Sequence, residues 1–400
     1  MYICGPTVYA RAHVGNARPF VVGMWLRSWL RERGYEVTFV HNITDVNDRI
    51  YEAAPGRSAQ LAEDATAWYL EDTADLGLGM PDELPKATEF IPQIIRFIEE
   101  LIDAGFAYEV EGDVYFRVAR DPGYGRLSGQ RPDQVEEQEP NPLKEDPRDF
   151  ALWKANKPDE DTWWDSPWGR GRPGWHIECS VMAEELLGPV FEIHGGGLDL
   201  VFPHHENELA QSGALGHQFA QIWAHNGILE FTGEKMAKSV GNIVSLRDGI
   251  DEYGAETLLL LFLGAHWRKP MDLSEETLEQ AAARGDRFRE VFRNLSEPAP
   301  ADAWERFAAA LDDDFNTPEA LAVMHEWRDH ELLRRALRVF GLDSLAETAT
   351  APADVVELAE RRRRVRADGD FDQADRLREQ ITAAGWEVRD VEDGFQLVPR

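Results

Sequence analysis

The chain opens with Tyr2-Ile3-Cys4-Gly5-Pro6, followed by Ala12-His13-Val14-Gly15-Asn16. This stretch decides its fold class. Tyr2–Cys4 predicts a short strand, which Gly5-Pro6 ends. Apolar residues at helical spacing predict a helix over Ala17–Arg33, and the β-branched segment Glu36–Asn42 predicts a second strand. A strand, a helix and a strand in this order indicate an α/β fold with a parallel sheet.

The rest of the chain divides by composition and pattern. Residues 57–105 are expected to be helical, and 106–150 form a mixed insertion rich in Pro, Asp and Glu. The α/β pattern resumes at about 151, with strands expected at Val190–Ile193 and Gln221–Ala224. From about 254 the pattern is helical, with a break at Ser296–Ala301, and residues 370–400 predict a small terminal αβ unit.

Length and composition indicate a large cytoplasmic protein. The chain has 400 residues, of which 43% are hydrophobic, so we expect two or three domains. No apolar run is long enough for a membrane span, and no secretory signal opens the chain, so we expect no membrane association. Two widely separated cysteines do not form a disulfide framework, which favours the cytoplasm.

The formal net charge of −32 points, taken alone, away from nucleic acid, because phosphate binding usually needs a basic surface. Adaptation to high salt is the alternative that we favour, because a Debye length of about 3 Å at 1 M salt suppresses repulsion between like charges. The scarcity of lysine supports it, although a high-G+C genome would also favour arginine. The seven lysines are Lys86, Lys144, Lys154, Lys157, Lys235, Lys238 and Lys269.

Four residues offer the donor atoms of a zinc site. Cys4 and Cys179 supply sulfur, while His204 and Glu208 stand four residues apart and would share one face of a helix. Zinc accepts sulfur, imidazole nitrogen and carboxylate oxygen, so the set fits a four-ligand site that could also receive an external thiol. Each cysteine taken by itself is more often a small buried hydrophobic residue.

Two segments have the character of nucleotide contacts. His13, Gly15 and Asn16 stand where the first helix begins, and a helix N-terminus favours phosphate; a turn with a capping Asn16 is the alternative. The run His194-Gly195-Gly196-Gly197-Leu198-Asp199 would let an adenine approach the backbone, with Asp199 accepting from a ribose hydroxyl; a tight strand-to-helix turn is the alternative.

A lysine-containing loop, Glu234-Lys235-Met236-Ala237-Lys238-Ser239, follows the glycines Gly227 and Gly233. Two lysines three residues apart in a mobile loop can stabilise the charge that develops on transferred phosphates. In a chain so poor in lysine the pair is unusual, but a solvated charged loop is the alternative.

These motifs, in this order, resemble the cysteinyl-tRNA synthetase family of class I aminoacyl-tRNA synthetases. The resemblance covers nearly the whole chain. The motifs that carry it are Cys4-Gly-Pro-Thr-Val-Tyr9, His13-Val-Gly-Asn16, Asn42-Ile-Thr-Asp45, Gly174-Trp-His-Ile-Glu-Cys-Ser180, His194-Gly-Gly-Gly-x-Asp-Leu200, Phe202-Pro-His-His-Glu-Asn-Glu208, Lys235-Met-x-Lys-Ser239, Asp149-Phe-Ala-Leu-Trp-Lys154 and Leu311-Asp-Asp-Asp-Phe-Asn-Thr-Pro318.

The resemblance implies a fold and an activity. The fold is a Rossmann-like catalytic domain over 1–253 with the insertion at about 106–150, a helical stem and tRNA-binding domain over 254–350, and an anticodon-recognition unit over 351–400. The activity is the ATP-dependent attachment of cysteine to tRNA(Cys) through a cysteinyl-adenylate, with Mg²⁺ accompanying ATP. We expect a monomer without an editing domain.

The resemblance also implies the roles of individual residues. Zinc would be held by Cys4, Cys179, His204 and Glu208, and would bind the thiolate of the substrate. Gly5, Thr44 and Trp175 would line the cysteine pocket. The catalytic residues would be His13, Asn16, Lys235 and Lys238, and the ATP contacts His13, Gly15, Asn16, His194, Gly196, Asp199, Lys235 and Lys238.

Some positions depart from the family pattern. Met1 lies almost at the first strand, where the family usually has a preceding segment, so we expect either a missing strand or a misassigned start. Asn16 replaces a common His, Asn47 replaces an aspartate, Ala237 replaces a serine, and the helical region after Thr317 is short. Basic residues at 361–366 and 334–338 could contact tRNA phosphates or form ion pairs on helix surfaces.

Three rival interpretations stay open at this point. A cysteine ligase that joins activated cysteine to a small amine would share the signatures and the zinc. A degenerate synthetase-like module would bind without catalysis, and a nucleotidyltransferase would share the His-x-Gly helix start but would have no use for four zinc ligands.

Overall fold

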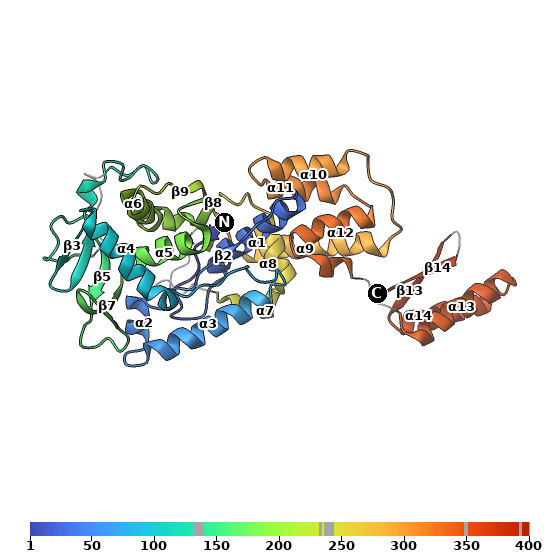
Figure 1. Ribbon diagram of the computed structural model, residues 1–400. Coiled ribbons are helices and arrows are strands. Elements are labelled where there is room, and N and C mark those ends of the chain that lie inside the picture. Colours follow the sequence, from blue (N-terminus) through green and yellow to red (C-terminus); the bar gives the residue numbers. More distant parts are fainter. Residues whose placement is uncertain (132–138, 232–233, 236–243, 348–350, 392–393, 400) are drawn as a thin grey trace.

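A computed structural model describes residues 1–131, 139–231, 234–235, 244–347, 351–391 and 394–399 (Figure 1). Among these residues no helix is long and apolar enough to cross a membrane. The strands are β1 Tyr2–Ile3, β2 Val40–His41, β3 Ala107–Val110, β4 Asp113–Phe116, β5 Phe150–Ala155, β6 Trp164–Ser166, β7 Gly169–Pro173, β8 Val190–Gly197, β9 Phe219–Asn226, β10 Leu229–Phe231, β11 Glu234–Lys235, β12 Met271–Asp272, β13 Trp386–Val391 and β14 Gly394–Pro399.

The helices alternate with strands in the first half and follow one another in the second. They are α1 Val14–Glu32, α2 Asp48–Ala53, α3 Ser58–Ala74, η1 Ala87–Phe90, α4 Ile91–Asp103, η2 Val118–Arg120, α5 Trp175–Leu187, η4 Leu198–Leu200, η5 Val201–His205, α6 Glu206–Ala214, α7 Leu246–Tyr253, α8 Ala255–Leu263, α9 Glu275–Arg293, α10 Ala303–Asp312, α11 Thr317–His325, α12 His330–Val339, η7 Asp343–Ala346, α13 Ala353–Ala367 and α14 Phe371–Ala383.

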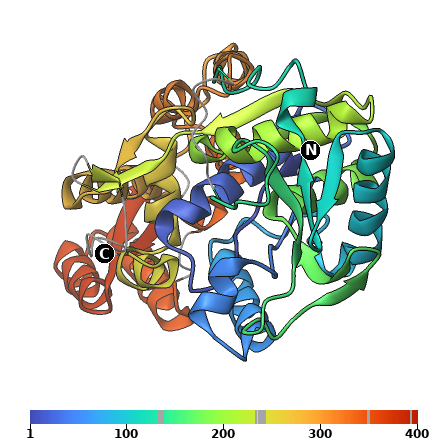
Figure 2. The same cartoon turned by 90° about the vertical axis from the view of Figure 1, so that its left-hand side faces the viewer.

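A parallel sheet in the order β2-β1-β8-β9 lies at the centre of the first half, as the opening segment predicts. Successive side chains of a strand point to opposite faces. Ile3 therefore joins the core that α1 covers, whereas Tyr2 and Cys4 join the core on the α5 side. In Figure 2 the dark blue α1 and the green α5 and α6 lie around this sheet. This alternation brings Cys4 to the face that carries Cys179.

Two predicted elements differ in the structure. Of the strand expected over Glu36–Asn42 only Val40–His41 pairs in the sheet, because β1 offers just two residues to pair with. The helical region expected over 57–105 is two helices, α3 and α4, joined by a connection that contains Gly77 and Gly79 with φ of 74° and 78°. These left-handed conformations favour glycine and end the helix.

A five-stranded sheet in the order β3-β4-β5-β7-β6 follows α4 and extends to Pro173, beyond the expected end of the insertion at about 150. Its core contains Phe116 and Phe150, whose rings stack with centroids 4.9 Å apart. Strand β7 pairs antiparallel with β5 and leads directly into Gly174 and α5. The insertion sheet therefore ends where the helix that carries Cys179 begins.

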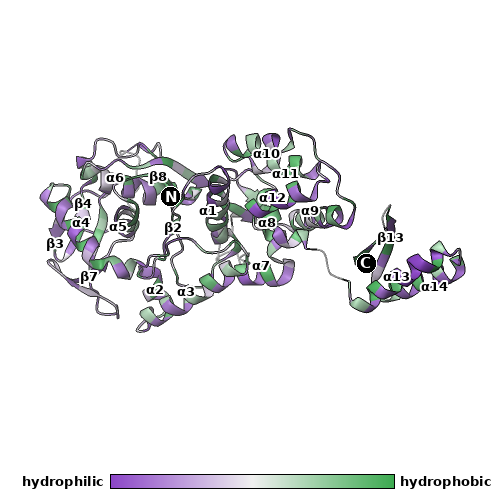
Figure 3. Ribbon diagram, turned by 45° about the vertical axis from the view of Figure 1, so that its right-hand side comes forward, coloured by the Kyte–Doolittle hydropathy of each residue, from purple (hydrophilic) through white to green (hydrophobic). Residues whose placement is uncertain are grey.

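The helices after Gly254 pack against α1 and share its core. Trp25 of α1 donates its indole N–H to the carbonyl of Phe340, at 2.9 Å. Helix α8 contributes the buried run Leu258–Leu263, and Figure 3 colours this helix mostly green. The predicted break at Ser296–Ala301 is confirmed, because it falls between α9 and α10.

The last residues form the small αβ unit that the sequence predicts. Helices α13 and α14 pack on the antiparallel pair β13–β14 and enclose a core of Val355, Ile381 and Trp386. Figures 1 and 3 show this unit set apart at one end of the molecule. Arg362, one of the arginines of the basic run, is buried and pairs with Asp390.

Candidate functional site

The four candidate zinc ligands come from four separate elements of the structure. We call this group, Cys4, Cys179, His204 and Glu208, the cysteine cluster. Cys4 follows β1 and donates its backbone N–H to the carbonyl of Gly195 on β8. Cys179 lies on α5, His204 at the end of η5, and Glu208 in the first turn of α6. The sheet and the helices α5, η5 and α6 therefore bring all four side chains together.

Distances within the cysteine cluster suit a shared metal ion. The sulfur atoms of Cys4 and Cys179 lie 3.8 Å apart and form no disulfide. Nε2 of His204 lies 3.1 Å from Oε1 of Glu208, and Sγ of Cys4 lies 3.9 Å from the same oxygen. One donor atom of each residue lies within 4.8 Å of all the others, and all four residues are buried.

Burial sets the ionisation of these groups while no cation is present. It raises the pKa of the Cys4 and Cys179 thiols and of the Glu208 carboxyl, and lowers the pKa of His204. The neutral forms are therefore favoured in this dry environment. A divalent cation would reverse this preference, because it stabilises thiolates and a carboxylate directly. Two thiols, an imidazole and a carboxylate are a donor set that fits zinc.

A second buried set overlaps with the first, and the sequence did not indicate it. Cys4, Glu208, His194 and His205 also place donor atoms within 4.8 Å of one another. Nε2 of His194 lies 2.7 Å from Oε2 of Glu208, and Nδ1 of His205 lies 2.7 Å from Nε2 of His225. The signal available in the sequence was the abundance of histidine around the motifs, since only eleven occur in the chain.

Trp175 and Gly5, two of the residues expected in the cysteine pocket, adjoin the cluster. The Trp175 ring stacks on His204 with centroids 4.2 Å apart. Thr44 is buried, and its Oγ1 accepts a hydrogen bond from Nδ2 of Asn42 at 3.3 Å. Gly5 runs against the backbone of Asn42, where a Cβ would lie 1.6 Å from the carbonyl oxygen, so only glycine fits there.

His13, Gly15 and Asn16, the expected nucleotide contacts of the first motif, lie at the start of α1. This helix begins at Val14, three residues before the predicted Ala17. The backbone N–H of His13 donates to Oδ1 of Asn16 at 3.3 Å. Asn16 thus caps the helix, the alternative that the sequence left open, and this use of its side chain does not by itself provide a contact to ATP. Gly15 lies against the His13 ring.

The expected adenosine contacts separate into two groups. Gly196 and Asp199 lie where β8 ends, with Asp199 exposed, and β8 runs through the glycines to Gly197 rather than turning before them. His194 differs, because it is fully buried and both ring nitrogens are engaged, Nδ1 with the Tyr2 carbonyl and Nε2 with Glu208. This position corrects the expectation that His194 contacts ATP, because neither nitrogen is left for a nucleotide.

The lysine loop lies largely outside the described residues. The backbone of Lys235 pairs with Glu230 in the β10–β11 ladder. Lys238 falls outside the part of the chain that the structure describes.

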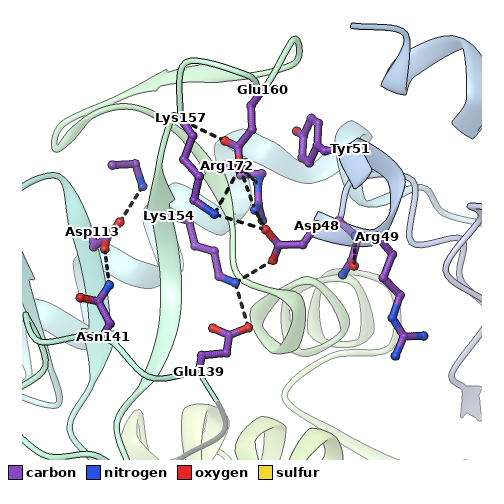
Figure 4. Close-up of polar contacts among 12 residues, drawn as sticks. Asp48, Arg49, Tyr51, Asp113, Glu139, Asn141, Lys154, Lys157, Glu160 and Arg172 are labelled. Atoms are coloured by element: carbon purple, nitrogen blue, oxygen red, sulfur yellow. Dashed lines mark hydrogen bonds and ion pairs between the residues drawn. The ribbon is translucent and has the colours of Figure 1, made fainter. Parts of the chain in front are cut away.

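A polar network missed by the sequence analysis lies between α2 and the insertion sheet (Figure 4). Lys154 Nζ lies 2.9 Å from both Asp48 and Glu139, and the buried Arg172 pairs with Asp48 and with Glu160. We call these residues, with Lys157, the Asp48 network. Burial raises the pKa of Asp48, but Lys154 and Arg172 outweigh it, so this pKa lies below its ordinary value. The sequence held one signal of this network: Lys154 ends the motif Asp149-Phe-Ala-Leu-Trp-Lys154 in a chain that has few lysines.

A cavity of about 270 Å³ is lined by residues of the Asp48 network and by neighbours of the cysteine cluster. Its lining includes Trp175 and His176 together with Lys154 and Arg172. Nδ1 of His176 lies 2.9 Å from Nδ1 of His204, so the cavity wall is joined directly to the cluster. A small polar molecule bound next to Trp175 would therefore be separated from His204 of the cluster by a single side chain.

Comparisons with known proteins agree along the chain. Residues 1–283 match the family of class I (C) tRNA synthetase catalytic domains, and residues 306–342 match the DALR domain. The chain is 43% identical to a cysteine–tRNA ligase of Pseudothermotoga lettingae, with 98% of this chain and 93% of that protein covered. It is 44% identical to a cysteine–tRNA ligase of a Jannaschia species, with 100% and 92% covered.

Solved structures resemble the fold at low sequence identity. The Mycobacterium tuberculosis methionyl-tRNA synthetase in complex with methionyl-adenylate matches with a TM-score of 0.62 at 16% identity, covering 86% of this chain and 87% of that one. The LeuRS–tRNA–LeuAMS complex of Agrobacterium radiobacter matches with a TM-score of 0.60 at 10% identity, covering 86% and 83%. These likenesses show the class I synthetase fold.

Proposed function

The chain belongs to the cysteinyl-tRNA synthetase family of class I enzymes, and from this premise we propose that its cysteine cluster holds the zinc ion that selects cysteine. The protein catalyses the ATP-dependent attachment of cysteine to tRNA, so its substrates are cysteine, ATP and tRNA(Cys). The observation that carries the zinc proposal is the meeting of two thiols, an imidazole and a carboxylate from four elements, all buried.

The chemistry supplied by bound zinc would be direct ligation of the substrate thiolate. A serine hydroxyl is a far poorer ligand than a thiolate, so a site built for sulfur rejects serine strongly, and an editing domain is unnecessary. Trp175, stacked on His204, would form the wall that orients the substrate. Thr44 and Gly5 would leave room beside Cys4, since Gly5 allows the backbone to approach Asn42 closely.

The chain's own residues would then position ATP for attack by the cysteine carboxylate. The start of α1 carries the partial positive charge of a helix N-terminus, and the backbone N–H of Gly15 would meet phosphate there, with His13 beside it. The N–H groups of His13 and Val14 are already bonded to Asn16 and Val244. Gly196 and Asp199, at the end of β8, would receive the adenosine. Lys235 and Lys238 would stabilise charge on the transferred phosphates, and Mg²⁺ would accompany ATP. Asn16 caps the helix through Oδ1, and its Nδ2 would contact ATP.

After activation, the terminal ribose of tRNA would attack the cysteinyl-adenylate in a second step governed mainly by positioning. We propose that the helical region of 254–350 and the terminal unit of 351–400 hold the tRNA, with the catalytic domain over 1–253. We further propose that the protein acts as a cytoplasmic monomer. The relatives named above are cysteine–tRNA ligases and do not favour transfer of cysteine to a small amine.

Aminoacylation combined with metal analysis tests the proposal. Purified protein would be supplied with total tRNA, ATP, Mg²⁺ and radiolabelled cysteine, with radiolabelled serine as the matched control, in dilute buffer and in molar KCl. We expect cysteine-specific labelling of tRNA and one zinc per chain. Labelling of tRNA by an enzyme that holds no metal would overturn the zinc proposal, and activation of cysteine without labelling of tRNA would favour the small-amine alternative.

A further inference from the structure

His194 joins the first strand to a proposed metal ligand. Its side chain is 0% exposed. Nδ1 lies 3.2 Å from the carbonyl oxygen of Tyr2, and Nε2 lies 2.7 Å from Oε2 of Glu208. A carbonyl oxygen only accepts, so Nδ1 must donate to it, and this bond fixes the ring with Nε2 directed at Glu208. The proton of the second contact lies on Nε2 or on Oε2 of Glu208, and a carboxylate at Glu208 requires it on Nε2.

Glu208 divides its two oxygens between different partners. Oε2 faces His194, while Oε1 faces the interior of the cysteine cluster, 3.1 Å from Nε2 of His204 and 3.9 Å from Sγ of Cys4. Holding Oε2 therefore leaves Oε1 directed towards the point where the four donors meet. A carboxylate ligand needs such a partner, because outer hydrogen bonds orient metal ligands.

We propose that His194 is a positioning residue that orients Glu208 for zinc. The inference rests on the proposed zinc site and gives His194 a role other than contact with ATP. Packing supports it, because the ring lies edge-on to Tyr2 with centroids 5.2 Å apart and packs against both His205 and Trp223, at 4.5 and 4.8 Å. Rotation of the ring would break these contacts and both hydrogen bonds.

Direct ligation by His194 is the rival arrangement. His194, His205, Cys4 and Glu208 lie close enough to form a second four-residue set, and Nε2 of His205 has no hydrogen-bond partner among the described residues. That set would exclude Cys179, which lies 3.8 Å from Cys4, and would need His194 to give up Glu208. The experiment must therefore separate a residue that binds zinc from one that orients a ligand.

Two amide substitutions divide the functions of the His194 ring. In His194→Gln the side-chain amide reaches the position of Nε2 and can donate to Glu208. In His194→Asn the shorter amide reaches the position of Nδ1 and can donate only to the Tyr2 carbonyl. His225→Asn is the matched control, because His225 belongs to the same group of histidines and bonds to His205 but is not in either four-residue set.

Zinc content and the rate of zinc release to a chromogenic chelator would be measured for the full-length protein and the three variants. We expect one zinc per chain throughout, release accelerated about 10- to 100-fold in His194→Asn, and rates near wild type in His194→Gln and His225→Asn. Cobalt-substituted proteins should all keep the absorption of two thiolate ligands.

Several outcomes would overturn the inference. Equal release rates in the Asn and Gln variants would show that His194 only fills space, and loss of the metal from both would indicate a direct ligand. If the Asn variant does not fold, a crystal structure of the zinc-loaded wild type decides the question: a His194 nitrogen at about 2.0–2.1 Å from zinc contradicts the proposal, and one that still bonds to Glu208 supports it. A wild-type protein without zinc would overturn the proposed zinc site as well.

Discussion

The Asp48 network lines a cavity whose wall contacts the cysteine cluster through Trp175 and His176, and the two regions solve the same problem differently. Each brings acidic groups together from distant segments. In the network, Asp48 and Glu160 are matched by Lys154 and Arg172, and Asp48 keeps 35% of its side-chain surface exposed. In the cluster, two thiols and Glu208 are buried beside imidazoles and the Tyr2 hydroxyl, and the ion pairs of Glu208 among the described residues involve no lysine or arginine.

The difference shows where the chain needs an external cation. Burying ionised groups without opposite charge costs several kcal/mol each, so such groups normally stay neutral or bind a metal. The network supplies its own cations, and the pKa of Asp48 is accordingly lowered. The cluster supplies none, and the pKa of Glu208 is raised. A metal ion would do for the cluster what Lys154 and Arg172 do for the network.

Removing a ligand from the cluster should have the largest effect. Cys179→Ala removes a sulfur donor from a fully buried position while changing little volume. We expect zinc binding to fall sharply and cysteine-dependent exchange of pyrophosphate with ATP to fall more than about 100-fold, because ligand loss exceeds the usual cost of an outer-sphere change. Metal analysis and exchange assays would measure both. Full exchange activity in a zinc-free variant would remove the contrast between the two regions.

Breaking the network should lower stability instead. Asp48→Asn leaves the buried Arg172 with Glu160 alone and Lys154 with Glu139 alone. We expect a loss of about 1–3 kcal/mol in the free energy of unfolding, between the values typical of exposed and of buried pairs. Urea unfolding of the zinc-loaded protein would measure it. Asp165→Asn, which removes an exposed pair with Arg170, is the control and should change stability by less than about 0.5 kcal/mol.

The two regions should respond oppositely to pH. The pKa of Glu208 is raised in the folded protein. In metal-free protein its contribution to folding stability is therefore present below the ordinary pKa of 4.5 and is lost as the pH rises through the pKa of the folded state. The pKa of Asp48 is lowered in the folded protein. Its contribution to folding stability is therefore present above the ordinary pKa of 3.8 and is lost as the pH falls through the pKa of the folded state.

Unfolding of the wild type, Glu208→Gln and Asp48→Asn at a series of pH values, after removal of metal, would measure this contrast. As the pH rises, the free energy of unfolding of metal-free Glu208→Gln should increase relative to that of the metal-free wild type. The increase should be about 1.4 kcal/mol for each unit by which the pKa of Glu208 is raised. Slopes of the same sign for both sites would contradict the comparison.

Salt should produce the smallest difference. The half-exposed network is open to screening, so in 1 M KCl the cost of Asp48→Asn should shrink by less than about 1 kcal/mol. Release of zinc from the fully buried cluster should not change. The interpretation of the acidic surface as halophilic adaptation stays a prediction, and higher stability and activity in dilute buffer than in molar KCl would refute it.

The sequence by itself determined residue types and their order. Cys4, Cys179, His204 and Glu208 could be named because metal ligands are few and their chemistry does not depend on the fold. The first strand and helix could be predicted because their patterns are local, and the family followed from the order of the motifs. The connection at Gly77 and Gly79 was missed, although its two glycines, followed by Pro81 and Pro85, are residues that end helices.

Only the tertiary structure decided orientation and pairing. His194 belongs to a glycine-rich motif that favours a nucleotide contact, yet its place on β8 buries it between Tyr2 and Glu208. Asp48 meets Arg172 across 124 residues of chain, a separation at which no local pattern specifies contact. The physical reason is that residue type fixes which bonds a side chain can form, while burial and the neighbours that the fold brings to it fix which of those bonds it makes.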